Sequence, residues 1–204
     1  LTNIDKSPKI SDAKKTQYKG EAHFLRGLYY FNLVRLFGDV PWIDKQQTAS
    51  DDLQVSRTSK DIVYQHIIDD FSDAASMLPA VYENTTDIGR ATKGAAFGLL
   101  AKVYLTLKRY NETLVAIDSV MNLGVYSLNR KYEWNFSDLR ENGPESLFEV
   151  QYEKDVTAYS EFDILGQGGW HHEYMAPLAS INIGGPWGNF GWFAVYPEFV
   201  ESYE

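Results

Sequence analysis

The sequence predicts a mainly α-helical protein, in which paired helices form the first part of the chain and an irregular, loop-rich region forms the rest. Three observations support this prediction. Apolar residues recur with helical spacing over residues 16–123. Glycine and aromatic residues are interspersed without a regular period over residues 166–196. Between these regions, residues 148–152 alternate apolar and polar side chains, which predicts a short strand or one arm of a hairpin.

The first helix is expected to begin near Thr16 and to end at Gly38, a left-handed C-cap that Pro41 follows. The helix is apolar on nearly every side, so we expect it to be buried between neighbouring elements. Its apolar positions are Ala22, Phe24, Leu25, Leu28, Phe31, Val34 and Leu36.

A second helix is expected to begin at Thr58 or Ser59, because Asp61 lies three residues after Thr58 and makes an acidic variant of a capping box. Pro79 marks its end. We expect its apolar face to consist of Ile62, Ile67, Phe71, Ala74, Ala75 and Leu78.

Residues 91–107 and 111–123 predict a third and a fourth helix, with Asn111 as the N-cap and Gly124 as the C-cap of the fourth. Their large–Leu–small–Tyr and Tyr–small–large spacing is that of a tetratricopeptide helix pair. The positions are Phe97, Leu100, Ala101 and Tyr104, then Tyr110, Thr113 and Ile117. Thr113 replaces the usual alanine. Two helix pairs are fewer than a free-standing repeat array needs, so we expect further packing surface from elsewhere.

The composition argues against several function classes. The 204 residues contain 19 basic and 28 acidic side chains, a net charge of −9, so we expect no nucleic-acid partner. Cysteine is absent, which removes disulfides, thiol catalysis and cysteine metal sites. No segment reaches the roughly 20 apolar residues of a membrane-spanning helix. The chain opens on Leu1 and stops within a helix expected from Pro197, so we expect it to be a fragment.

No enzyme motif is complete. His172 and Glu173 begin like a zinc-protease helix, but Ala176 stands where the second histidine belongs. Gly166, Gly168 and Gly169 are followed by His171 in place of the third glycine of a dinucleotide loop. The many paired carboxylates are typical of a solvated surface. We therefore expect no catalytic residue, no metal and no cofactor.

The glycine–aromatic region contains the candidate ligand-binding residues. Glycine allows tight loops that expose flat side chains, and indole and phenol rings suit the C–H faces of sugar rings. The candidates are the rings Trp170, Tyr174, Trp187 and Trp192, with His171 and Asn189 as polar partners. Alternatively, the three tryptophans fill a secondary core beneath the loops, because only a few residues of any binding loop touch a ligand.

Several sequence blocks resemble the SusD/RagB family of surface glycan-binding lipoproteins in Bacteroidetes-type outer membranes. Residues 21–43 read EAHFLRGLYYFNLVRLFGDVPWI, and Gly89 and Arg90 lead into ATKGAAFGLLAKVYL. Residues 145–152 read ESLFEVQY, and the chain closes on GGPWGNFGWFAVYPEFVESYE. These blocks occur in the family order over nearly the whole chain.

This resemblance implies a SusD-like α–α superhelix in which residues 16–124 form the scaffold and residues 125–204 the ligand face of one domain fragment, 1–204. It implies an oligosaccharide or peptide ligand that is passed to a TonB-dependent, SusC-like transporter. It also implies attachment to the outer membrane, facing outward, through a lipid anchor that this chain lacks. Two alternatives stay open: a tetratricopeptide-type protein-interaction scaffold without sugar binding, and a glycosidase with two carboxylates flanking one cleft.

Overall fold

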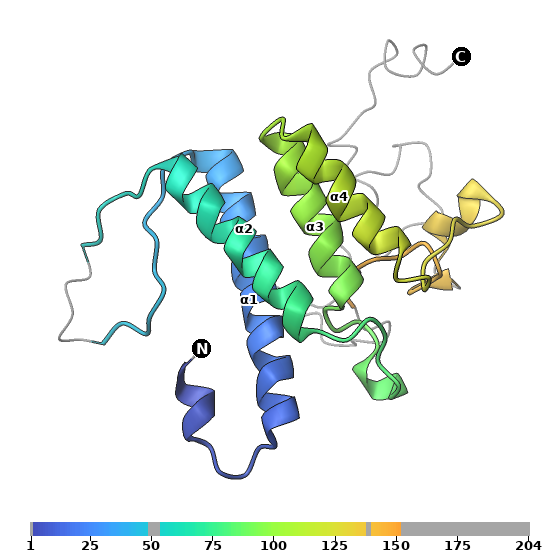
Figure 1. Ribbon diagram of the computed structural model, residues 1–204, viewed down its shortest axis with the longest axis horizontal. Coiled ribbons are helices and arrows are strands. Elements are labelled where there is room, and N and C mark those ends of the chain that lie inside the picture. The colour runs from blue at the N-terminus through green and yellow to red at the C-terminus, as the bar shows by residue number, and fades with distance from the viewer. Residues whose placement is uncertain (1, 49–53, 138–139, 152–204) are drawn as a thin grey trace, which may run out of the picture. The chain divides into compact units, whose positions relative to one another are not determined.

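The computed structural model describes residues 2–48, 54–137 and 140–151 (Figure 1). The chain divides into two compact units, Leu1–Glu149 and Val150–Glu204, and the description below concerns the first of them. The described residues of this unit form four α-helices and three short 3-10 helices, Thr2–Lys6, Thr85–Asp87 and Tyr132–Phe136. The predicted mainly helical fold is thus confirmed. The division of one domain into a scaffold, residues 16–124, and a ligand face, residues 125–204, stays a prediction.

Helix α1, Asp12–Phe37, begins four residues before the predicted start. Ser11 caps it, because the Ser11 hydroxyl accepts a hydrogen bond from the backbone N–H of Lys14. At the other end Gly38 adopts a positive φ of 68° and its N–H donates to the carbonyl oxygen of Val34, so the predicted end is confirmed. Although α1 is long, none of the described helices has the sustained apolar character that a bilayer span requires.

Helix α2, Lys60–Met77, begins where it was expected, but the predicted capping box is wrong. The Ser59 side chain makes no capping bond, and Thr58 instead pairs its backbone with Val40 in an isolated antiparallel bridge. The first helical N–H, of Lys60, donates to the Asp39 carboxylate at 2.8 Å. The cap is therefore supplied by Asp39, which follows α1 in the chain. A sequence pattern confined to α2 cannot reveal it.

Helices α3, Lys93–Thr106, and α4, Tyr110–Met121, form the second pair. The Thr92 hydroxyl caps α3 by accepting from the N–H of Ala95 at 3.1 Å. The predicted Asn111 cap is wrong, because α4 starts one residue earlier and Arg109 occupies the cap position. The predicted Gly124 C-cap is also wrong, because Asn122 occupies the C-cap position and Gly124, with a positive φ of 66°, lies two residues further on.

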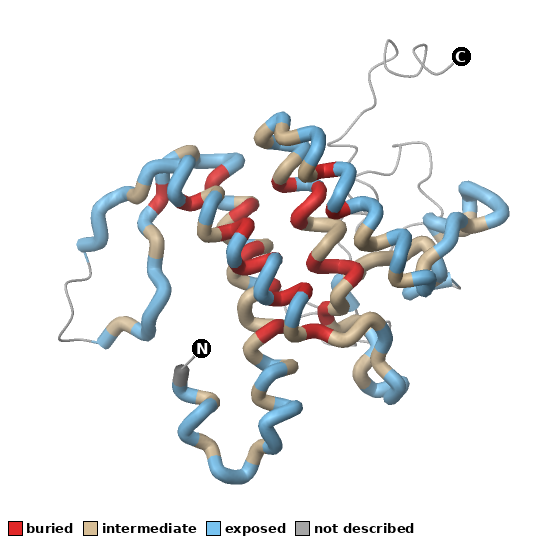
Figure 2. The backbone as a smooth tube through the Cα atoms, viewed as in Figure 1, coloured by how far each residue is buried: buried red, intermediate tan, exposed pale blue. Residues whose placement is uncertain are grey.

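The helices pack in chain order, α1 on α2, α2 on α3 and α3 on α4. Figure 2 shows the buried positions gathered where these helices face one another. Within the first pair, Gly27 of α1 lies against the ring of Phe71 of α2, where an added Cβ would be 3.1 Å from ring atoms. A glycine at this position lets the two helices approach closely around a large ring.

The expectation that α1 is buried on nearly every side is wrong for the described unit. Phe24, Phe31 and Val34 are buried, whereas Tyr29 is 64% and Leu36 is 76% exposed. The reason is that only one side of α1 faces α2. On α2, Ile62 is 53% exposed, against the prediction, and Val63 is buried in its place.

The strand predicted for residues 148–152 is wrong over 148–151, which are irregular, and Tyr152 lies outside the described residues. The described part of the chain contains no strand that pairs with it. Phe148 instead packs edge-on against Phe24 of α1, with ring centroids 4.9 Å apart. The alternation of apolar and polar residues here accompanies packing of the Phe148 ring against α1, and not hydrogen bonding between paired strands.

Candidate ligand-binding site

The six residues predicted to bind ligand fall outside the described part of the chain, so their placement stays a prediction. They are Trp170, His171, Tyr174, Trp187, Asn189 and Trp192. The predicted final helix from Pro197 also lies outside it.

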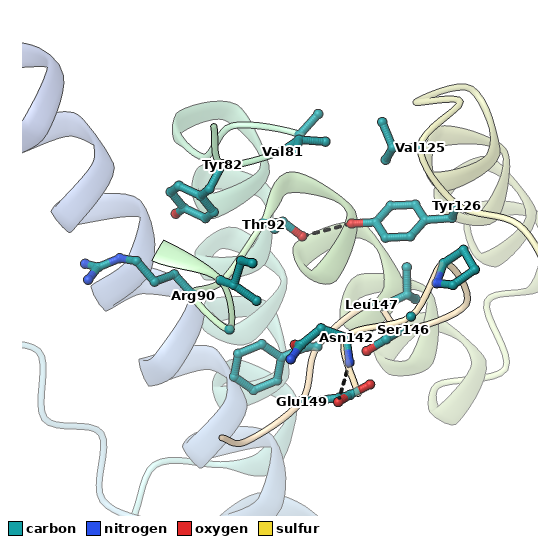
Figure 3. Close-up of a pocket in the computed structure, with 16 residues that line it drawn as sticks. Val81, Tyr82, Arg90, Thr92, Val125, Tyr126, Asn142, Ser146, Leu147 and Glu149 are labelled. Carbon is teal, nitrogen blue, oxygen red and sulfur yellow. Dashed lines mark hydrogen bonds between the residues drawn. The ribbon is translucent and has the colours of Figure 1, made fainter. Parts of the chain in front are cut away.

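The described unit contains a cavity of about 240 Å³ that the sequence did not reveal (Figure 3). Three segments line it: the turn between α2 and α3, the chain after α4, and the loop of residues 142–149. The lining combines aromatic rings with hydroxyl, amide and carboxyl groups, and includes Tyr82, Thr92, Tyr126, Asn142, Ser146 and Glu149. Apolar walls with a few convergent polar groups are the usual composition of a small-molecule site.

Two glycines of α3 make room for this wall. A Cβ on Gly94 would lie 2.3 Å from the Tyr126 ring and hydroxyl, and a Cβ on Gly98 would lie 2.7 Å from a methyl of Leu147. The Tyr126 hydroxyl lies 3.0 Å from the Thr92 hydroxyl, which itself caps α3. Glycines four residues apart lie on one face of a helix, so the two wall side chains pack directly on the α3 backbone.

Hydrogen bonds within the loop of residues 142–149, and one to Ser127, hold this loop in place. Asn142 has a positive φ of 54°, and its N–H donates to the Glu149 carboxylate at 3.0 Å. The carbonyl of Pro144 accepts from the N–H of Ser127 at 2.9 Å, and the N–H of Ser146 donates to Gly143 at 3.0 Å. These bonds fix the lining of the cavity before any ligand is present.

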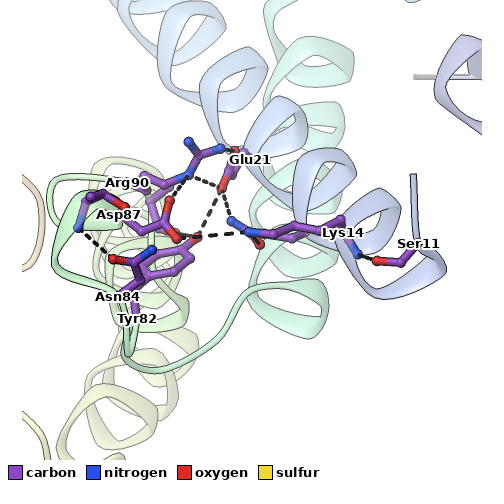
Figure 4. A network of polar contacts seen from close by, with 10 residues as sticks. Ser11, Lys14, Glu21, Tyr82, Asn84, Asp87 and Arg90 are labelled. Carbon is purple, nitrogen blue, oxygen red and sulfur yellow. Dashed lines mark hydrogen bonds and ion pairs between the residues drawn. The ribbon is translucent and has the colours of Figure 1, made fainter. Parts of the chain in front are cut away.

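An ion-pair network anchors the opposite wall to α1 (Figure 4). Glu21 of α1 accepts two hydrogen bonds from the guanidinium of Arg90, one of them from Nε at 2.8 Å. The Tyr82 hydroxyl lies 3.1 Å from the same carboxylate and 2.8 Å from the carbonyl oxygen of Ala91. The network therefore connects α1 with the turn that carries Tyr82 and Arg90.

The charges in this network stabilise one another. Partial burial would raise the pKa of Glu21, but hydrogen bonds from Arg90, Gln17 and Tyr82 outweigh it and hold that pKa below its ordinary value of 4.5. Burial and the Glu21 carboxylate raise the pKa of Tyr82, so the phenol keeps its proton at neutral pH. The Glu21 hydrogen bonds also raise the pKa of Arg90.

A second polar cluster joins α1 to α2. Asp70, 2% exposed, accepts from Arg26 at 2.8 and 2.6 Å and lies 2.7 Å from His23 Nδ1. Arg26 also lies 5.0 Å from the centroid of the Trp42 ring. Each of these polar groups has a partner within the cluster, so the cluster stabilises the helix pair. In the described residues, no three acidic or histidine side chains lie close enough to bind a metal.

The fold defines a scaffold of successive helix pairs that carries a loop-lined cavity. The model of the SusD-like family, described as "Starch-binding associating with outer membrane", matches residues 1–105, and the chain belongs to this family. The resemblance of the sequence blocks is thus confirmed. The chain spans between 18% and 35% of the length of the curated relatives it matches.

Three relatives illustrate the similarity. A SusD-like protein of Bacteroides ovatus is 32% identical over 155 residues, which cover 70% of this chain and 28% of that protein. A SusD superfamily structure from Parabacteroides distasonis is 29% identical with a TM-score of 0.84, over 100% of this chain and 42% of that one. A laminarin-binding SusD-like protein is 28% identical with a TM-score of 0.68, over 74% of this chain and 34% of that one.

Sequence reasoning missed the cavity because its walls come from three separated segments. Two signals were present: the glycines at positions 94 and 98, and the Gly89–Arg90 pair before α3. Glycines spaced four apart in a helix indicate close packing of another segment. They do not indicate which side chain packs there, and Tyr126 lies 32 residues after Gly94 in the chain.

Proposed function

We propose that this chain is part of a cell-surface protein that binds an oligosaccharide and does not cleave it. The family match over residues 1–105 carries the proposal, because that family is described as starch-binding. A relative that shares the helical scaffold is named for binding laminarin. Both polymers are glycans, which makes a carbohydrate the ligand class that these comparisons favour.

The aromatic residues predicted from the sequence are the proposed platform for the sugar. Trp170, Tyr174, Trp187 and Trp192 would stack on C–H faces, and His171 and Asn189 would bond to hydroxyls. This arrangement binds a chain of sugar rings through their common shape. The six candidates contain no carboxylate, whereas glycoside hydrolysis would need two that flank one cleft.

We further propose that the protein acts at the outer face of the outer membrane and passes its ligand to a TonB-dependent, SusC-like transporter. The family description includes association with the outer membrane. A lipid anchor outside this sequence would hold the protein there. Co-purification of the full-length protein with such a transporter from detergent-solubilised membranes tests this part separately.

The binding proposal is tested by calorimetric titration of the full-length protein with starch and laminarin oligosaccharides. Alanine at all four platform positions is expected to abolish measurable heat, because each lost ring contact weakens binding by about 1 kcal/mol. Tyr132→Ala is the control, since Tyr132 is a highly exposed aromatic outside the platform and the cavity. Unchanged affinity in the fourfold variant would show that the platform is wrong, and products of cleavage would show an enzyme.

One observation favours a second candidate, a protein-interaction scaffold without sugar binding. Helix α1 exposes an apolar face in the described unit, formed by Leu25, Tyr29, Leu33 and Leu36. Such a face is typical of a docking surface for another helix. This candidate predicts that no glycan changes the tryptophan fluorescence of the full-length protein, whereas the glycan-binding proposal predicts a change.

A further inference from the structure

We propose that the 240 Å³ cavity between α3 and the loop of residues 142–149 is a subsite for one uncharged sugar ring. The inference rests on the proposed carbohydrate function and assigns a second place of contact, apart from the aromatic platform. It names the class of sugar that this place accepts.

The size of the cavity limits its occupant. Pockets for drug-sized ligands have volumes of about 300–1,000 Å³. At about 240 Å³, this cavity lies just below that range, a size that suits a single sugar ring. One residue of a longer glycan, or its end, therefore fits.

The chemistry of the walls suits a sugar ring. Apolar surface comes from Val81, Val125 and Leu147, and the rings of Tyr82 and Tyr126 lie on opposite sides of the cavity (Figure 3). Ser146 and Asn142 contribute hydroxyl and amide groups to the lining. A pyranose has the same combination of apolar C–H faces and a rim of hydroxyls, so both kinds of wall have a matching group on the ligand.

The charges of the walls select against an anion. Arg90 is the only cation among the described lining residues, and Figure 3 shows its guanidinium extended away from the cavity, toward α1. There it is bound to the carboxylate of Glu21. The wall also contains the carboxyl group of Glu149. An anionic ligand would lose its hydration in the cavity and find no cation there to pair with. A neutral ring does not carry this cost of desolvation.

Three matched ligand pairs test the selectivity: the methyl glycosides of glucose, galactose and mannose against those of their uronic acids. The members of each pair differ only at C6, which is a hydroxymethyl carbon in the neutral sugar and a carboxylate carbon in the uronate. Binding to the full-length protein is followed by saturation-transfer NMR and titration. At least one neutral glycoside is expected to bind about tenfold more tightly than its uronate. Equal or tighter binding of every uronate would overturn the proposal.

Two blocking variants test the location. Ser146→Phe places a ring inside the cavity, and Val125→Trp does the same from a wall position that is 39% exposed and therefore tolerant of change. Both are expected to abolish monosaccharide binding and to leave helical content unchanged by circular dichroism. Leu128→Phe is the control, because Leu128 is 83% exposed and does not line the cavity.

A converse variant tests the charge argument. Val125→Lys adds a cation to the wall and is expected to raise uronate affinity about tenfold relative to the neutral partner. Val115→Lys, at an exposed position on α4, adds the same charge elsewhere and is expected to have no effect.

The outcomes separate this inference from the proposed function. If the blocking variants bind monosaccharides as the wild type does, the cavity is no subsite, while oligosaccharide binding through the platform stands. If the platform variant loses oligosaccharides and still binds a methyl glycoside that Ser146→Phe does not, two sites exist. If the wild type binds no carbohydrate at all, both proposals fall.

Discussion

The two helix pairs of this chain are held together by different kinds of contact. The first pair, α1 and α2, buries large rings and a charged cluster: Phe24, Phe31, Phe71 and Asp70 are almost fully buried. The second pair, α3 and α4, buries mainly small side chains: Ala95, Ala96, Ala101, Thr113 and Ala116. The first interface depends on matched polar groups among aromatic rings, and the second depends on close approach of the backbones.

This difference has a consequence for substitutions. Removal of a charge should matter most between α1 and α2, where the partner groups cannot all reach water. Addition of volume should matter most at the two glycines of α3, where an added Cβ would overlap Tyr126 or Leu147. Exchanges of small groups within α4 should matter least. A different order of the measured losses would contradict this difference between the two helix pairs.

The largest effect is expected for Asp70→Ala. The substitution leaves the guanidinium of Arg26 and the ring of His23 without their buried acceptor. We expect the free energy of unfolding to fall by about 3 kcal/mol. Urea denaturation of the full-length protein, followed by circular dichroism, measures it.

Asp69→Ala is the matched control for that substitution. Asp69 is the neighbouring residue on α2, but it is exposed and accepts a hydrogen bond from Gln65 of the same helix. We expect a change within about 0.5 kcal/mol. If the two alanine variants lose equal stability, the Asp70 cluster does not stabilise the first pair in the way described.

The next effect is expected for Gly94→Ala on α3. Alanine favours the helix by about 1 kcal/mol, yet its Cβ would overlap the Tyr126 ring. Displacement of that ring breaks its hydrogen bond with Thr92. We expect a net loss of about 1 kcal/mol together with weaker binding of neutral glycosides, since Tyr126 lines the cavity.

Gly98→Ala is the comparison for this variant. Its Cβ would meet mainly one terminal methyl of Leu147, which can rotate aside. The loss of stability should therefore be smaller than for Gly94→Ala, and glycoside binding should change less. A greater loss at Gly98 would contradict the assignment of Tyr126 as the rigid wall.

A smaller effect, dependent on pH, is expected for Glu21→Gln. The folded-state pKa of Glu21 lies below 4.5, so the ionised carboxylate stabilises the fold above the unfolded pKa. That contribution is complete at pH 7 and is lost as the pH falls through the folded pKa. We expect the glutamine variant to be less stable by about 0.5 kcal/mol at pH 7, because the pair with Arg90 is only partly buried.

The pH series supplies the check. Urea denaturation at steps below pH 4.5 should show the wild type and the glutamine variant converging, since the protonated wild-type carboxyl also lacks the charge. Glu83→Gln, at an exposed position outside the network, serves as the control and should follow the wild type at every pH. A constant gap between wild type and Glu21→Gln would mean that the carboxylate charge is not what stabilises this link.

Much of the helical fold was predictable because its signals are local. Gly38 ends α1 through its own φ and its bond to Val34, and both are consequences of nearby sequence. The errors occurred where a distant residue intervenes. Asp39 caps α2 from the end of the preceding helix, and Phe148 packs on α1 instead of pairing as a strand.

The site was less predictable than the fold. The aromatic platform was proposed from composition alone and lies outside the described residues, so it stays a prediction. The cavity depends on three segments brought together by packing, with Tyr82 and Tyr126 separated by 43 intervening residues. Local periodicity carries no information on which separated side chains will share a wall.

The smallest effect is expected for Thr113→Ala, at the position where the tetratricopeptide pattern usually has alanine. Thr113 is buried, but its hydroxyl donates to the carbonyl oxygen of Arg109 within the same helix at 2.9 Å. That bond satisfies the hydroxyl without a partner on α3, so alanine leaves no polar group of α3 unpaired. The lost methyl destabilises and the higher helix propensity of alanine stabilises, each by about 0.5–1 kcal/mol. We expect a net change within about 0.5 kcal/mol by urea denaturation. Thr113→Val keeps the volume and removes only the hydroxyl, so a loss above 1 kcal/mol in the valine variant would show that this hydroxyl, and not close backbone approach, holds the second pair together.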